Sequence, residues 1–188
     1  KPDQMRCGGT TGSVGDVRLG MATQFVVGPA GESDSELLVR AESLYHELRV
    51  ARAYYSALLP IPDTPLEGNV PTDPRRELRL YQADFLLRRY GFEAAELPYD
   101  QGGGLLAEVD PKRAWARAHP ERFPIEVNRA SYRELLRVPG IGPQTARTIL
   151  AVRRQSKLRE MGDLKKLGAR IGVSAPFVLL DGRRPPLQ

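Results

Sequence analysis

The spacing of apolar residues divides the chain into a part with strand and helix patterns and a part with helix patterns alone. A short β-rich run at 23–27 ends in the sequence GPAGESDSE, and apolar residues then recur at helical spacing from Leu37 to Leu48. A second run, at 52–59, predicts another strand. Strand, helix and strand in this order predict a βαβ unit with parallel strands and a right-handed crossover.

The middle of the chain alternates loops and helices. A proline-rich stretch at 60–74 predicts a structured loop. Helical spacing resumes over 75–92, with Gly91 as the expected stop. The sequence DQGGG at 100–104 is the best domain boundary, and 110–124 predicts a short helix. The inward face of the helix over 75–92 is expected to hold Leu78, Tyr81, Phe85 and Leu86, and the short helix is expected to pack through Trp115, His119 and Phe123.

Composition narrows the class of protein. Hydrophobic residues make up 41% and charged residues 27% of the 188 residues, as in globular domains, and no window approaches the roughly 18 apolar residues of a membrane span. The one cysteine, Cys7, excludes a disulfide framework or multi-cysteine metal site within this chain and favours a cytoplasmic location. The chain begins at Lys1 without a secretory signal, as a fragment or a processed chain would, and residues 1–22 predict a glycine-rich loop.

Charge is distributed unevenly along the chain. Residues 1–110 hold 11 basic and 17 acidic side chains, whereas residues 111–188 hold 17 basic and 6 acidic ones. Only the second part has the positive net charge that favours a polyanion such as nucleic acid.

A Gly-Pro turn connects two helix patterns in the basic part. Ser131 begins the first helix with the capping-box sequence SYRE, and Tyr132, Leu135 and Leu136 are expected to point inward. Ile141 is expected to fill the space between the helices, and Pro143 opens the second one. Main-chain amides of this turn would then lack internal acceptors at the positive end of a helix dipole, which suits a phosphate. They belong to Gly140, Gly142, Gln144 and Thr145.

The sequence IEVNRASYRELLRVPGIGPQTARTIL, residues 125–150, resembles the helix-hairpin-helix DNA-binding motif, including the Asn-x-Ala-Ser start seen in competence-type DNA-binding proteins. The resemblance implies contacts to duplex phosphates across the minor groove, mostly without reading bases. A turn that merely connects two helices is the alternative. We expect DNA contacts from Gly140, Ile141, Gly142, Gln144, Thr145, Arg147, Arg153, Arg154, Lys165, Lys166 and Arg170.

The hairpin is expected to bind rather than to catalyse. Related glycosylases with lyase activity have a catalytic lysine two residues after the second hairpin glycine, where this chain has Gln144, and an amide forms no Schiff base. The catalytic residues, if there are any, are unknown.

A looser copy of the hairpin pattern follows at 164–180. We expect Gly168 and Gly172 at its turn and Ser174 as a cap. In tandem relatives the second hairpin holds the opposite strand, but the loose glycine spacing here leaves a purely structural role equally open. Its expected core residues are Leu167, Phe177 and Val178.

The first part of the chain carries a second resemblance. TQFVVGPAGESD followed by YYSALLPIPDTPL resembles the later strands of the radical S-adenosylmethionine barrel, and the downstream segments occur in that family's order. Residues 23–182 are similar to the C-terminal part of radical S-adenosylmethionine proteins of DNA modification or repair that end in a helix-hairpin-helix domain.

This resemblance implies S-adenosylmethionine and a four-iron four-sulfur cluster for the full-length family. The cluster is held by a Cys-x-x-x-Cys-x-x-Cys loop that this chain lacks, so we expect no cofactor and no metal in the chain itself. His46 has no paired ligand either. The alternative interpretation of the Gly-x-x-Gly-Glu sequence is a turn that begins a helix. In a completed barrel the cofactor-binding residues would be Gly28, Gly31, Glu32 and Ser56.

The predicted fold is α+β and mostly helical, with a partial parallel (β/α) barrel half followed by an all-α helix-hairpin-helix domain. The expected parts are a barrel-like region at 1–100, a linker at 101–127 and the DNA-binding domain at 128–188. Parallel strands without neighbours would leave an open edge. We expect a partner chain, an upstream region or a local rearrangement to cover it.

Two functions stay open. The first is sequence-independent binding of duplex DNA, as the C-terminal part of a radical S-adenosylmethionine enzyme that modifies or repairs DNA. An upstream domain, a second chain or a DNA-repair protein would be its further partners, and no membrane is expected. The second is a non-enzymatic DNA-binding and docking protein from a truncated or split gene. A hairpin that binds protein or RNA is a weaker third.

Overall fold

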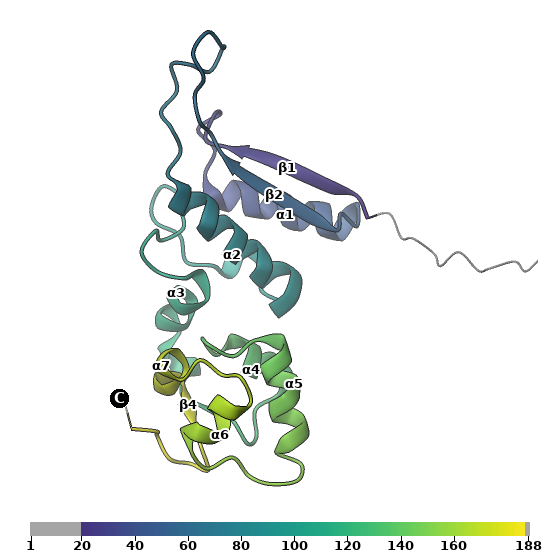
Figure 1. The fold of residues 1–188 in the computed structure, drawn as a ribbon, viewed down its shortest axis with the longest axis vertical. Helices are drawn as coiled ribbons and strands as arrows, with labels where there is room; N and C mark the ends of the chain where they lie inside the picture. Colours follow the sequence, from purple (N-terminus) through teal and green to yellow (C-terminus); the bar gives the residue numbers. More distant parts are fainter. Residues whose placement is uncertain (1–19, 187–188) are drawn as a thin grey trace, which may run out of the picture.

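The first part of the chain folds as the predicted βαβ unit. The computed structural model describes residues 20–186 and contains β1 (Ala22–Val27), α1 (Asp34–Glu47) and β2 (Arg52–Ala57) (Figure 1). The two strands pair in parallel, with Ala22 opposite Arg52 and Val27 opposite Ala57. The parallel pair is therefore confirmed, whereas most of the glycine-rich loop expected over residues 1–22 lies outside the described residues.

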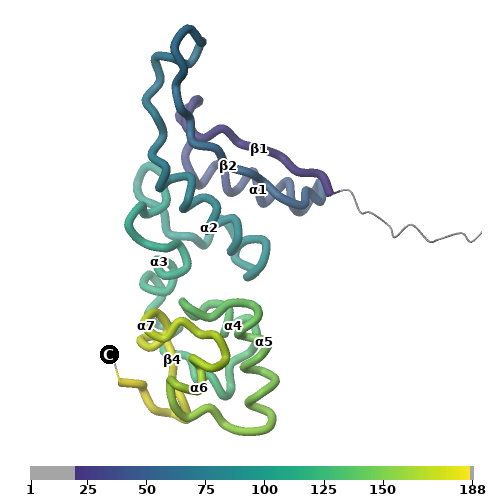
Figure 2. The backbone as a smooth tube through the Cα atoms, in the orientation of Figure 1, coloured from purple at the N-terminus to yellow at the C-terminus, as the bar shows by residue number. Residues whose placement is uncertain are grey.

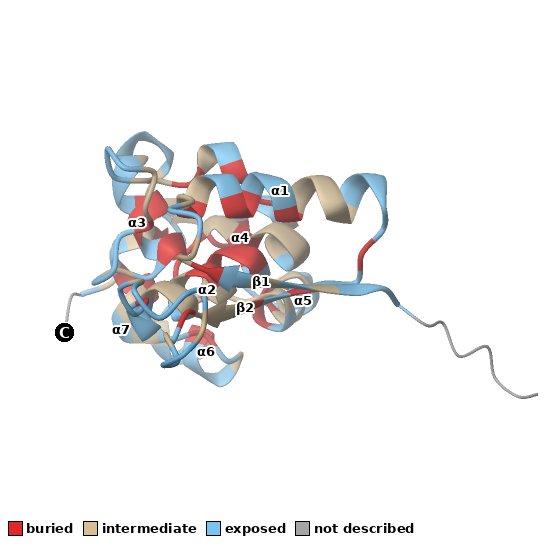
Figure 3. Ribbon diagram, turned by 90° about the horizontal axis from the view of Figure 1, so that it is seen from above, coloured by how far each residue is buried: buried red, intermediate tan, exposed pale blue. Residues whose placement is uncertain are grey.

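Helix α1 begins at a capping box. The Ser33 side chain accepts from the amide of Glu36, and the Glu36 carboxylate accepts from the amide of Ser33 at 2.7 Å. Two of the free amides at the helix start are satisfied in this way. Buried residues follow one side of the helix, while the other side is exposed (Figure 3).

Helix α2 (Pro74–Tyr90) has the predicted ends but a different inward face. Asp73 caps its start, and Gly91, at a φ of 67°, ends it. Leu78 is 51% exposed and Phe85 is 44% exposed, so these two expected core positions were wrong. The helix carries apolar residues on two faces, and packing against the sheet and α1 selected the other one. The buried residues are Leu80, Ala83, Asp84 and Leu86.

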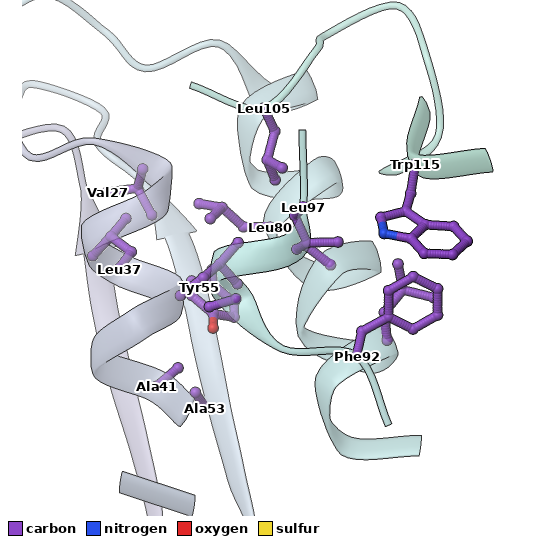
Figure 4. Close-up of a cluster of buried hydrophobic side chains, with 14 of the residues drawn as sticks. Val27, Leu37, Ala41, Ala53, Tyr55, Leu80, Phe92, Leu97, Leu105 and Trp115 are labelled. Carbon is purple, nitrogen blue, oxygen red and sulfur yellow. The ribbon is translucent and has the colours of Figure 1, made fainter. Parts of the chain in front are cut away.

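The first core lies between the sheet, α1 and α2. Val27 and Tyr55 from the strands meet Leu38 from α1 and Leu80 from α2, all almost fully buried (Figure 4). The segment after α2, with the short 3₁₀ helix η1 (Ala94–Glu96), adds Phe92, Leu97 and Leu105 to the same cluster. The loop between β2 and α2 instead projects away from this core (Figure 2).

The outer edge of β2 is closed by side chains. Three amides of the strand donate to a phenol or carboxylate oxygen from a helix, so they need no neighbouring strand. The pairs are Ala53 with Tyr45 (3.0 Å), Tyr55 with Tyr81 (3.0 Å) and Ala57 with Glu77 (2.8 Å). Within residues 20–186 no side chain accepts from an amide of β1. The expected local rearrangement thus protects one edge of the sheet.

A row of aromatic rings connects the first core to the second, and the expected packing of the short helix is confirmed. Helix α3 (Pro111–Ala118) carries Trp115, whose ring lies 5.3 Å from Phe92 and 6.3 Å from Phe123 between centroids. Phe123 in turn lies 5.2 Å from Phe177, and His119 stacks on Trp115 at 4.4 Å. These rings fill the space between the two clusters.

We call the part of the chain that forms the first core, from β1 to Leu105, the first lobe. The segment at 100–104, predicted as a domain boundary, is bound to it. The carbonyl of Gly103 accepts from the amide of Ser35 at 3.0 Å, and the amide of Leu105 donates to Asp34 at 2.8 Å. The division into three parts stays a prediction.

The second lobe, residues 120–179, contains four α-helices. Contrary to the all-α expectation, it also contains a pair of parallel strands of two residues each. The helices are α4 (Tyr132–Arg137), α5 (Pro143–Val152), α6 (Met161–Lys166) and α7 (Ile171–Ser174). Around them lie η2 (Pro120–Arg122), β3 (Ile125–Glu126), η3 (Ala175–Phe177) and β4 (Val178–Leu179). Strand β3 pairs with β4 and brings the two ends of the lobe together.

The α+β class is confirmed, but two parallel strands do not make a barrel, and the barrel half stays a prediction. Within the described part of the chain, no helix is both long and apolar enough to span a membrane.

Candidate nucleic-acid interface

The candidate site is the turn between α4 and α5. Helix α4 starts at the predicted capping box, where the Glu134 carboxylate accepts from the amide of Ser131 at 2.7 Å. Hydrogen bonds from the amide and side chain of Ser131 hold the pKa of Glu134 below its usual value. Leu135 and Leu136 are buried as expected, and Tyr132 is half-buried.

Each residue of the turn has a distinct role. Gly140 has a φ of 83°, where a side chain is strained, and a Cβ built on it would lie 2.8 Å from the carbonyl oxygen of Arg170. Ile141 is 1% exposed and fills the space between the helices, as predicted. Gly142 is the N-cap of α5, and Pro143 is its first residue. The turn therefore depends on a glycine at 140.

Two carbonyls of the turn are bonded from within the protein, whereas among its amides that of Ile141 donates to the carbonyl of Val138 at 3.1 Å. The carbonyl of Gly140 accepts from the amide of Arg170 at 3.0 Å, and that of Ile141 accepts from the Lys112 Nζ at 2.6 Å. Four amides at the turn and the start of α5 have no hydrogen-bond acceptor within residues 20–186. These are the amides of Gly140, Gly142, Gln144 and Thr145. Free donors at a helix start form a site suited to an anion.

Comparison with known protein families places a match on this part of the chain. Residues 122–172 match a family described as the helix-hairpin-helix motif. The match includes α4, the turn, α5 and α6, and it supports nucleic-acid binding by this part of the chain. No curated protein and no solved structure matches the chain.

The outer face of α5 continues from the helix-hairpin-helix turn. Gln144, Arg147 and Arg154 are exposed. Arg153 differs from the expectation, because its Nη1 donates to the carbonyls of Val127 (2.9 Å) and Ala130 (2.6 Å). Arg153 therefore holds the segment before α4 in place, a contact that residue spacing did not predict.

The second hairpin packs against the first. Gly168 turns the chain at a φ of 91°, and its carbonyl accepts from the Thr145 hydroxyl at 3.2 Å. Gly172 lies inside α7, so its expected place at the turn was wrong. Ser174 stands at the N-cap of η3 as expected, but its buried hydroxyl has no partner among the described residues. The core residues Leu167, Phe177 and Val178 are confirmed, and the three basic residues are exposed: Lys165, Lys166 and Arg170.

Acidic residues of the second lobe are engaged in local contacts. Glu126 accepts from the amides of Gly182 and Asn128, and Asp163 accepts from the amide of Arg159. The latter bond lowers the pKa of Asp163. Between residues 122 and 184 there are 14 basic and 5 acidic residues. The carboxylates thus serve caps and turns, and most of the basic side chains stay at the surface.

Asn128 explains why an asparagine stands at the start of the motif. Its Nδ2 donates to the carbonyl of Leu158 at 2.8 Å, and its Oδ1 accepts from the amide of the same residue at 2.9 Å. An amide side chain is suited to bond both groups of one residue. Asn128 therefore fixes the loop that follows α5.

Lys112 supports the turn and was missed by the sequence analysis. It belongs to α3 and is 7% exposed, and its Nζ lies 4.5 Å from the centroid of the Tyr90 ring. Burial lowers the pKa of Lys112 to about 7. A lysine next to a proline in a short helix gives no sequence signal of such a contact.

The expected cofactor residues lie together at the carboxyl end of the parallel strands. Gly28 and Gly31 have positive φ angles, and the Glu32 carboxylate accepts from the amides of Gly28 and Ala30. Glu32 thus closes a turn before α1, as the alternative interpretation holds. The Ser56 hydroxyl accepts from the Gln24 side chain at 2.8 Å.

Residues for an iron–sulfur cluster are missing. The 188 residues contain one cysteine, whereas such a cluster is held by several thiolates, so this chain does not fit the group. Within the described residues, no three His, Cys, Asp or Glu side chains are grouped as a metal site would require, and His46 is exposed.

Replacing Gly140 by Ala should destabilise the protein by about 1–3 kcal/mol, because the new Cβ meets a backbone carbonyl at a positive φ. The matched variant Gly142→Ala should cost less than about 1 kcal/mol, since its Cβ would only touch the Tyr90 hydroxyl at 3.4 Å and its φ is −99°. Urea unfolding measures both. Equal losses would show that the close approach of the two hairpins does not constrain the turn.

Replacing Lys112 by Met should remove a pH dependence of stability. Burial sets the pKa of Lys112 at about 7 in the folded protein, against its usual 10.5, so between these values the unfolded chain binds the proton and the folded chain does not. The free energy of unfolding contributed by Lys112 therefore rises with pH across this interval. The difference between wild type and Lys112→Met, from urea unfolding at pH 6.5, 8 and 9.5, should grow with pH. A constant difference contradicts the assignment.

Proposed function

We propose that this chain binds the phosphate backbone of duplex DNA through its helix-hairpin-helix motif, without preference for sequence. One observation carries the proposal: the carbonyls of Gly140 and Ile141 are bonded from within the protein, whereas four amides at the turn and the start of α5 have no acceptor within residues 20–186. Free amides at the positive end of α5 are matched in charge and geometry to a phosphate oxygen.

The charge of the second lobe supports a polyanion as the ligand. Arg147 on the exposed side of α5 and Arg154, two residues beyond its end, extend the positive surface, and Lys165, Lys166 and Arg170 extend it over the second hairpin. A row of cations and amides matches a chain of phosphates better than a single small anion.

The absence of a sequence preference follows from the kind of contact. Main-chain amides and arginines at phosphates position a protein on DNA but carry no information about bases. Gln144, at the place of the catalytic lysine of related lyases, offers no amine for a Schiff base. The proposed role of this lobe is therefore binding alone.

The double variant Arg147→Ala, Arg154→Ala should weaken duplex binding to a similar extent for unrelated sequences. Each lost phosphate contact should reduce the slope of log K against log salt by about 0.9, so two lost contacts reduce it by about 1.8. Fluorescence anisotropy at several salt concentrations measures both quantities.

The matched control is Arg40→Ala, which removes one exposed arginine from α1, far along the sequence from the hairpin. It should leave the salt slope unchanged. An unchanged affinity in a double variant that unfolds at the wild-type temperature would refute the hairpin as the DNA contact.

We further propose that the first lobe is the tail of a radical S-adenosylmethionine barrel. Two observations favour this over a simple docking domain. Side chains of α1 and α2 accept from the outer amides of β2, whereas within residues 20–186 no side chain accepts from an amide of β1. The sheet can therefore be extended on the β1 side. Gly28, Glu32 and Ser56 also lie at the carboxyl end of the strands, where α/β folds bind their ligands.

The genomic reading frame distinguishes this proposal from the docking alternative. If the first lobe completes a barrel, the frame upstream of Lys1 should encode a Cys-x-x-x-Cys-x-x-Cys sequence. A stop codon in that frame before any such triplet would favour a non-enzymatic DNA-binding protein that uses the first lobe for docking.

A further inference from the structure

A groove runs between α2 and the two hairpins. It has a volume of about 940 Å³, and its lining comes from α2, the start of α3, the helix-hairpin-helix turn and the second hairpin. In Figure 1 helix α2 lies above α4 and α5. The size of the groove falls in the upper part of the roughly 300–1,000 Å³ of ligand-binding pockets. We call it the α2–hairpin groove.

The α2 side of the groove is apolar and aromatic. Leu78 and Phe85 line it, although they are 51% and 44% exposed. Tyr81 and Tyr90 line it as well, and the Phe85 and Tyr90 rings meet edge to face at 5.7 Å. These are the positions that helical spacing placed in the core, so the fold leaves an apolar surface uncovered beside the hairpin.

The hairpin side of the groove presents main-chain amides and Arg170, and α3 adds Arg113 beside it. Gly140 and Gly142, whose amides have no acceptor within the described residues, line it. Five basic side chains line the groove with a single carboxylate, that of Asp110, which caps α3. The basic residues are Arg52, Arg88, Lys112, Arg113 and Arg170.

An aromatic wall opposite an anion-binding wall matches a nucleotide whose base is unstacked. An intact duplex presents phosphates, sugars and polar base edges, and hides the flat faces of its bases, so it would leave Leu78 and Phe85 without a partner. An unpaired nucleotide offers both groups at once, a base that stacks on an aromatic ring and a phosphate that binds cations and amides.

We propose that the α2–hairpin groove binds an unpaired nucleotide at an interruption in duplex DNA, with the base against Phe85 and the phosphate at the helix-hairpin-helix turn. This inference rests on the proposed function, since the hairpin holds the adjoining backbone. It adds a ligand class to that function: the chain prefers a duplex that contains unpaired nucleotides to a continuous duplex. Gly142 belongs to both surfaces and connects them.

The test measures the affinity of the full chain for two DNAs by fluorescence anisotropy. One is a continuous duplex, and the other is the same duplex with a two-nucleotide unpaired bulge that includes 2-aminopurine. The bulged DNA should bind at least about fivefold more tightly, the lower end of what stacking of one base contributes. The 2-aminopurine fluorescence should fall on binding because the base stacks on a ring.

The variant Phe85→Ala should lose the preference for bulged DNA and the fall in fluorescence, and keep the wild-type affinity for the continuous duplex. Phe85→Trp should retain all three properties. The matched control is Tyr54→Ala, which removes a ring that is 41% exposed on β2 but does not line the groove, and it should keep the preference.

Three results would overturn the inference: equal affinity of the wild type for both DNAs, a preference that survives Phe85→Ala, or unchanged 2-aminopurine fluorescence. None of these affects the duplex-binding proposal, which fails separately if the Arg147→Ala, Arg154→Ala variant binds the continuous duplex as the wild type does. Thermal unfolding of each variant shows that it is folded.

Discussion

The bond between the Gly140 carbonyl and the amide of Arg170 is the interaction on which the candidate site depends. It requires the backbones of the two hairpins to approach so closely that no side chain fits at position 140. Together with the Lys112 contact to Ile141, it holds the turn from its carbonyl side. Four amides at the turn and the start of α5 are left without an acceptor within residues 20–186, as a phosphate site requires. One constraint thus fixes the second hairpin against the first and orients the donors of the first.

The second hairpin therefore has a clear structural role. It supplies the amide that binds Gly140 and the carbonyl that binds Thr145, and both contacts lie within its own turn. Three exposed cations do not conflict with that role, because the contacts to the first hairpin use main-chain groups of the second. The loose glycine spacing that weakened the resemblance is explained by this packing: Gly168 turns the chain, whereas Gly172 continues a helix.

Local sequence signals predicted most of the elements because each has a local physical cause. The capping box at Ser131, proline at the start of α5 and glycine after α2 placed helix ends. The turn and its free amides followed from the same reasoning. What failed depended on tertiary contacts. Helix α2 has two apolar faces, and only the sheet decides which is buried.

Long side chains were the other source of error. The position of a guanidinium or an ammonium group several bonds from the backbone cannot be obtained from residue spacing. Arg153 was expected to contact DNA and instead binds two carbonyls of its own lobe, whereas Lys112 carried no expectation and supports the turn. The role of Gly140 depends on main-chain geometry and was predictable. The roles of Arg153 and Lys112 depend on where the end of a long side chain lies and were not.

The aromatic row from Phe92 to Phe177 has a consequence for dissecting the chain. Trp115 belongs to the first cluster, while Phe123 and Phe177 pack against both, and Arg137 of α4 stacks on Phe92 at 3.8 Å. A fragment cut at residue 128 would lose Trp115, Phe123 and the Lys112 support together. Phe177 would then lose the ring that covers it, so a soluble minimal fragment has to begin before α3.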